Sequence, residues 1–119
     1  MNYSSSEDGV DHAWEINESH TIRFILKDLR REHTGIHGRV AIALGGTILR
    51  YDTFNLGRAE DRTRLANGAH KVLPRDVSEL VPIVDLAHQL DMICLYACNQ
   101  WEVERIKIVS VDASEAPVP

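Results

Sequence analysis

The stretch RVAIALGGTILRYDTF, from Arg39 to Phe54, decides the fold. Apolar and small residues alternate before Gly45-Gly46, and apolar and polar residues alternate after it. Two glycines between alternating segments are typical of a two-residue β-hairpin turn, because glycine adopts positive φ angles at no steric cost. We therefore predict two antiparallel strands, at 38–44 and 47–54.

The alternation extends toward the N-terminus. Ile22, Phe24 and Leu26 lie on one side of a predicted strand at 21–30, which a polar His/Gly connection at 33–38 joins to the hairpin. A short strand at 14–17 is a candidate fourth member. The sequence thus predicts a meander of three or four strands.

The apolar period changes from two to about 3.6 after Phe54, which predicts a helix over 59–73 that ends before Pro74. A second helix is predicted from Asp76, which has capping-box spacing to Glu79. Pro82 should kink this helix or shift its start to Val81. Residues 105–111 are a candidate last strand.

These elements predict an α+β fold, an antiparallel three- or four-stranded meander with two helices packed on one face. We expect residues 1–13 to be a mobile acidic tail, 14–111 a single domain, and 112–119 a linker-like tail. The predicted core comprises Ile22, Phe24, Leu26, Val40, Ile42, Leu44, Leu49, Tyr51, Leu65, Ala69, Val72, Val84, Leu90, Cys94 and Trp101.

Charge is unevenly distributed along the 119 residues, whose formal net charge is -5. Residues 1–19 carry five acids and no Lys or Arg, whereas residues 20–50 carry six bases against two acids. The end of the chain is acidic again. A basic middle between acidic ends indicates an anion-binding face, or simply a balanced solvated surface.

The sequence predicts an intracellular, cytoplasmic protein without membrane contact. No apolar run approaches the length of a membrane span, and the first 18 residues have no apolar leader segment. Cys94 and Cys98, four residues apart on the second predicted helix, are expected to be small core side chains and not a disulfide or redox pair.

Sites for catalysis or cofactors have little support in the sequence. His33 and His37 have metal-ligand spacing but lie in a predicted loop without further ligands. Asp52 and Glu60, with Asp61 and the more distant Asp28, are the candidate carboxylates of a metal-dependent nuclease. No nucleophile elbow or phosphate-binding glycine motif is present. We therefore expect neither a cofactor nor a bound metal.

Six arginines are the candidate binding residues. Arg30, Arg31 and Arg39 lie at or beside the connection after the first predicted strand, and Arg58, Arg62 and Arg64 lie on the first predicted helix. Guanidinium groups suit phosphate and carboxylate, because their planar fork binds two oxygens at once. The alternative is that the helical arginines only stabilise the helix through i,i+3 and i,i+4 ion pairs.

One resemblance rests on the strand from Ile22 to Arg31, the strand Arg39–Leu44, and the segment YDTFNL (Tyr51–Leu56) before an arginine-rich helix. This succession resembles the amino-terminal domain that precedes the RecA-type ATPase module in some phage and plasmid replication proteins. It covers roughly residues 14–100, and the ATPase module itself is absent from the chain. The resemblance implies an accessory domain in DNA replication that contacts DNA or a protein partner.

The sequence is compatible with three functions. The first is a non-catalytic interaction domain with a basic surface for nucleic acid or for a replication ATPase. The second is a small metal-dependent nuclease, which needs carboxylates that converge on a metal. The third is a protein-only oligomerisation domain, which would leave an apolar patch uncovered by the helices. The partner and the oligomeric state are undecided.

Overall fold

Four consecutive strands form an antiparallel meander in the computed structural model, which describes residues 9–104 and 110–112. The strands are β1 (Val10–Glu15), β2 (Thr21–Glu32), β3 (Gly35–Leu44) and β4 (Thr47–Asn55). A short fifth strand, β5 (Ser110–Asp112), pairs with β1 in parallel, which gives the sheet order β4-β3-β2-β1-β5. The Gly45-Gly46 turn joins β3 to β4 as predicted, with Gly45 at φ 60°.

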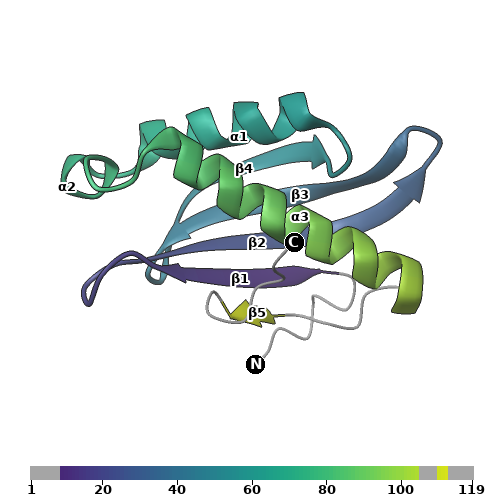
Figure 1. The fold of residues 1–119 in the computed structure, drawn as a ribbon, viewed down its shortest axis with the longest axis horizontal. Coiled ribbons are helices and arrows are strands. Elements are labelled where there is room, and N and C mark those ends of the chain that lie inside the picture. Colours follow the sequence, from purple (N-terminus) through teal and green to yellow (C-terminus); the bar gives the residue numbers. More distant parts are fainter. Residues whose placement is uncertain (1–8, 105–109, 113–119) are drawn as a thin grey trace.

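Three helices follow the meander: α1 (Ala59–Val72), α2 (Arg75–Ser78) and α3 (Ile83–Glu104). Figure 1 shows α1 running along β4 and α3 crossing the sheet diagonally, both on the same face. The predicted α+β fold, a meander with two main helices on one face, is confirmed. None of the helices in the described part of the chain is both long and apolar enough to cross a membrane.

The core lies between the helices and this face of the sheet. Of the predicted core, Ile22, Phe24, Leu26, Val40, Ile42, Leu65, Ala69, Leu90 and Cys94 are buried, while Leu44, Leu49 and Val72 are half-buried. Two predictions are wrong. Tyr51, which pairs with Ala41, lies on the face of the sheet away from the helices and is 49% exposed. Val84, in the first turn of α3, is 71% exposed. The side chain of Trp101 lies outside the described residues.

A β-bulge in β2 changes which residues face the core. The register shifts between Lys27 and Arg30, and Asp28 adopts φ 55°, a left-handed conformation that aspartate tolerates better than most residues. Beyond the bulge Leu29 is buried and Arg30 is exposed, the reverse of what strict alternation from Leu26 predicts. The bulge therefore directs Arg30 away from the core.

Several predicted boundaries differ from the structure. The first strand covers Val10–Glu15 and not 14–17, so residues 10–13 belong to the sheet and not to a tail. The predicted tails at 1–8 and 113–119, and residues 105–109 of the last strand, lie outside the described residues. The capping box at Asp76 is absent, since α2 has Pro74 as its N-cap without a side-chain cap. The long helix begins at Ile83, directly after Pro82.

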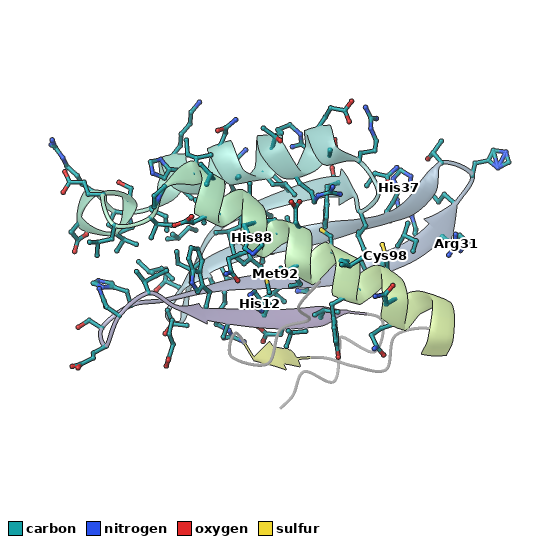
Figure 2. All side chains as sticks on the ribbon, in the orientation of Figure 1. His12, Arg31, His37, His88, Met92 and Cys98 are labelled. Atoms are coloured by element: carbon teal, nitrogen blue, oxygen red, sulfur yellow. The ribbon has the colours of Figure 1, made fainter. Side chains whose placement is uncertain are left out.

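A buried histidine connects three elements. His12 of β1 is completely buried and stacks on Phe24, with ring centroids 6.3 Å apart. Its Nδ1 lies 3.1 Å from the carbonyl oxygen of Val111 in β5, and its Nε2 lies 2.6 Å from Oε1 of Gln89 in α3 (Figure 2). His12 therefore ties β5 and α3 to β1.

Candidate functional site

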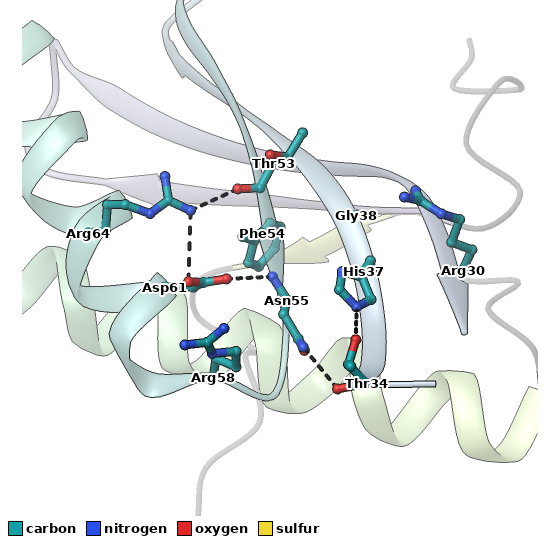
Figure 3. Close-up of a pocket in the computed structure, with 10 residues that line it drawn as sticks. All are labelled: Arg30, Thr34, His37, Gly38, Thr53, Phe54, Asn55, Arg58, Asp61 and Arg64. Atoms are coloured by element: carbon teal, nitrogen blue, oxygen red, sulfur yellow. Dashed lines mark hydrogen bonds and ion pairs between the residues drawn. The ribbon is translucent and has the colours of Figure 1, made fainter. Parts of the chain in front are cut away.

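A polar hollow opens where β4 turns into α1, beside the tip of the β2–β3 hairpin. Its volume is about 490 Å³. Figure 3 shows the ten residues that line it: Arg30, Thr34, His37, Gly38, Thr53, Phe54, Asn55, Arg58, Asp61 and Arg64. Because three of the six candidate arginines line this one space, we call it the arginine hollow.

Asn55 holds the hollow together from its base. It is buried, and its Oδ1 accepts a hydrogen bond from the Gly57 N–H at 3.0 Å while its Nδ2 donates to the carbonyl oxygen of Thr34 at 3.0 Å. Its backbone N–H donates to Oδ2 of Asp61 at 2.8 Å. These three bonds fix the β2–β3 turn, the end of β4 and the first turn of α1 relative to one another.

Two glycines keep the walls close together. Gly35 has φ 136°, and a Cβ atom there would lie 2.9 Å from Oδ1 of Asn55. At Gly38 a Cβ atom would lie 2.4 Å from Cδ2 of Leu29. Larger residues at these positions would therefore push the hairpin away from Asn55 and from the core.

Arg58 and Arg64 come from the start of α1. Arg58, the N-cap residue, has an ion pair with Glu60 at 3.8 Å, and both side chains are largely exposed. Arg64 donates from Nη2 to the carbonyl oxygen of Thr53 at 2.9 Å, and its guanidinium lies 3.9 Å from Asp52 and 4.0 Å from Asp61. A guanidinium has five N–H donors, so these contacts leave both arginines able to bind an additional anion.

Arg30 reaches the hollow from β2. It pairs with His37 across the strands and donates from Nε to Oε2 of Glu32. The Arg30 guanidinium lowers the pKa of Glu32 through this hydrogen bond and its charge, so the carboxylate is ionised at neutral pH. His37 accepts or donates a 2.7 Å hydrogen bond with Oγ1 of Thr34 according to its tautomer.

The other three candidate arginines lie elsewhere. Arg31 is exposed near the end of β2, where it pairs with Ile36. Arg39 donates to Oδ2 of Asp28 at 3.0 Å and lies over the Tyr51 ring, with Cζ 5.4 Å from the ring centroid. Arg62 is held between α1 and α3 by Asp91 and by the carbonyl oxygen of Leu56.

The candidate nuclease carboxylates are engaged with arginines. Asp52 accepts hydrogen bonds from Nε of Arg50 at 2.6 Å and from Nη2 at 3.4 Å, and this pairing raises the pKa of Arg50. Glu60 is exposed beside Arg58. Across residues 9–104 and 110–112, no three His, Cys, Asp or Glu side chains gather as metal ligands. The geometry around Asp52 is therefore that of an ion-pair network.

The hollow is suited to an anion. Three arginines, two threonines and a histidine line it, against the single carboxylate of Asp61, which is already bonded to Asn55. The N-terminal end of α1, which carries a partial positive charge, adds to the same field. The arginines are recognisable as candidates in the sequence, whereas Thr34 and Asn55 are not, because their only signal is their position in polar connections.

The chain matches no protein-family model, no curated protein and no solved structure. The resemblance to the amino-terminal domain of RecA-type replication ATPases therefore stays a prediction.

Proposed function

We propose that this protein is a non-catalytic accessory domain that contacts nucleic acid by binding backbone phosphate in the arginine hollow. One observation carries the proposal: Arg30 of β2 lines the same space as Arg58 and Arg64 at the start of α1. Arginine binds phosphate oxygens with two parallel hydrogen bonds, and such contacts dominate the affinity of proteins for nucleic acid.

The binding function is favoured over the nuclease. A metal-dependent nuclease needs carboxylates that converge on one or two cations. Asp52 instead accepts two hydrogen bonds from Arg50, and Glu60 points with Arg58 into solvent-exposed space. Phosphate binding needs only the donors that the hollow already presents.

The biological setting is taken from the resemblance. A domain of this kind that acts beside a RecA-type ATPase in the cytoplasm would help to position DNA, or the ATPase itself, during replication. Phosphate contacts fix position and orientation without reading base sequence. We therefore propose binding with little sequence preference.

The test is fluorescence anisotropy with labelled single-stranded and duplex DNA over a range of salt concentrations, comparing the native chain with Arg58→Ala and Arg64→Ala. Each variant should bind more weakly and lower the slope of log K against log salt by about 1, because one phosphate contact is lost. Arg75→Ala is the matched control, since Arg75 is 90% exposed on α2 and does not line the hollow.

Gel analysis of the same DNA with magnesium tests the alternative. Intact DNA together with an arginine-dependent, salt-sensitive affinity supports the accessory domain. Cleavage that depends on Asp52 supports the nuclease instead. Equal binding by the native chain, Arg58→Ala, Arg64→Ala and Arg75→Ala contradicts the proposal.

A second candidate function has its own observation. Leu80, which follows α2, and Ile83 and Val84, which begin α3, are exposed apolar residues close together in the chain, with exposed fractions of 55%, 39% and 71%. An exposed group of this kind favours contact with another protein chain, here a second copy. Sedimentation of the native chain and of Val84→Asp tests it: self-association that the substitution abolishes supports an oligomerisation domain.

A further inference from the structure

The face of the sheet away from α1 and α3 leads from the arginine hollow toward an exposed aromatic ring. Partners across antiparallel strands share a face, and alternate residues of one strand share it too. The pairs Tyr51↔Ala41, Arg39↔Thr53 and Arg30↔His37 therefore lie on one face. The buried residues Phe24, Val40 and Ile42 lie on the other, which α1 and α3 cover (Figure 1).

Tyr51 and Arg39 form a cation–π pair on this face of the sheet. Tyr51 is 49% exposed, whereas its small cross-strand neighbour Ala41 is buried. The guanidinium of Arg39 lies 5.4 Å from the ring centroid, and its side chain is 46% exposed. Nucleic-acid bases stack on aromatic rings and on arginine guanidinium planes alike.

We infer that the nucleic acid bound at the arginine hollow is single-stranded, with a base stacked on the Tyr51–Arg39 pair and a backbone phosphate in the hollow. This inference rests on the proposed function. A duplex does not fit the arrangement as well, because its bases are already stacked on one another. Within residues 9–104 and 110–112, this face also presents no helix to enter a groove.

The spacing sets the length of strand required. Tyr51 and Asn55 are four residues apart on β4, which corresponds to about 13 Å at the usual rise of an antiparallel strand. One nucleotide therefore reaches from the ring only to the near edge of the hollow at Thr53, which lies two residues from Tyr51, and not to its base. An oligonucleotide is therefore expected to bind much more tightly than a mononucleotide.

The charge of the face fits this occupant. Lys27 and Arg39, cross-strand partners on the same face, lie between Tyr51 and the hairpin tip that carries Arg30. Asp28 neutralises part of Arg39, and Glu32 part of Arg30. The route from the ring to the hollow is thus lined by cations whose acidic partners are exposed and can be displaced by phosphate.

The test is anisotropy with labelled oligothymidylates of roughly 4 to 16 nucleotides, a range that covers known single-strand sites, and with a duplex of matched length. Tyr51→Ala should weaken single-strand binding by about 5- to 100-fold, the usual effect of losing one stacked base. Tyr51→Phe should bind like the native chain, because the ring is kept. The salt slope of Tyr51→Ala should stay native, since no ionic contact is lost.

The outcomes separate this inference from the proposed function. Native single-strand affinity in Tyr51→Ala, or tighter binding of the duplex, overturns the single-strand inference. If Arg58→Ala still weakens binding in that case, phosphate contact at the hollow stands. If neither substitution changes binding, both proposals fail. Because Tyr51 lies on the surface, circular dichroism melting should show that its variants fold like the native chain.

Discussion

Arg62 on α1 donates a hydrogen bond from Nε to Oδ1 of Asp91 on α3. Its Nη1 donates to the carbonyl oxygen of Leu56 at 2.9 Å, so one guanidinium joins both helices to the turn before α1. The Arg62 side chain is 22% exposed. This arginine stabilises the fold, although in the sequence it cannot be distinguished from the arginines of the hollow.

Arg62→Ala should therefore lower stability without a direct effect on DNA binding. We expect a loss of about 1 kcal/mol in the free energy of unfolding, since one bond goes to a charged partner that is half-exposed and screened by solvent. Urea denaturation measures this loss, and anisotropy under strongly folding conditions measures binding. A variant with native stability but weakened DNA binding would contradict the structural role.

Glu32→Gln should strengthen DNA binding at neutral pH by about two- to threefold, because it releases Arg30 and removes an acid beside the hollow. The pKa of Glu32 is lowered in the folded protein, mainly by its hydrogen bond from Arg30. The ion pair is therefore intact above the ordinary glutamate range and is lost as the pH falls through the lowered value. The advantage of the variant should shrink over that acidic range.

Glu79→Gln is the matched control for this substitution. Glu79 accepts a 3.2 Å hydrogen bond from Arg75 on α2 and does not line the hollow. The change removes the same charge from another part of the surface. An equal gain from both substitutions would show that net charge, and not the release of Arg30, controls the affinity.

The sequence predicted the fold where local signals decide it. The Gly45-Gly46 turn and the alternation on either side specify the hairpin, since turn chemistry and a period of two act over a few residues. The bulge at Asp28 was missed because only the paired strand shows that an extra residue is present. Boundaries near Val10 were missed because burial there depends on contacts with residues far along the chain.

The candidate site was predicted only in part, because contacts between distant parts of the chain bring its residues together. Arginines at 30, 58 and 64 were identifiable as a class, but their separation from Arg62 depends on Asp91, 29 residues further along the chain. Asn55 has no signal in the sequence beyond its position in a polar connection. Its bond to Thr34, 21 residues away, is visible only in three dimensions.

Gly38→Ala should lower the free energy of unfolding by about 1–3 kcal/mol, the usual cost of overpacking a core. Gly38 is buried, and the added Cβ atom would lie 2.4 Å from Cδ2 of Leu29 and 3.2 Å from the carbonyl oxygen of Lys27. Leu29 is itself buried and cannot move into solvent. Urea denaturation at constant m-value measures the loss.

Gly46→Ala provides the comparison. A Cβ atom at Gly46 would meet no atom within 4 Å, and Gly46 is not among the glycines with positive φ. Its replacement should leave stability unchanged or raise it slightly, because alanine restricts the unfolded chain. Equal destabilisation by both substitutions would mean that the close contact of the added Cβ atom with Leu29 is not the cause of the stability loss at position 38.

Cys94 should react with a thiol reagent such as dithionitrobenzoate only when α3 separates from the core. It is 2% exposed, and burial raises the pKa of its thiol so that the reactive thiolate is rare at neutral pH. Cys98, one turn later, is half-buried. In a Cys98→Ser variant, Cys94 should therefore label slowly under native conditions, and full labelling should require denaturant.

Adding Arg62→Ala to this variant should accelerate the slow labelling of Cys94. Opening of the α1–α3 interface exposes Cys94, and this opening becomes easier without the bond from Arg62 to Asp91. Rapid labelling of Cys94 in the native chain would contradict its position in the core, and an unchanged rate with Arg62→Ala would show that Arg62 does not control this opening.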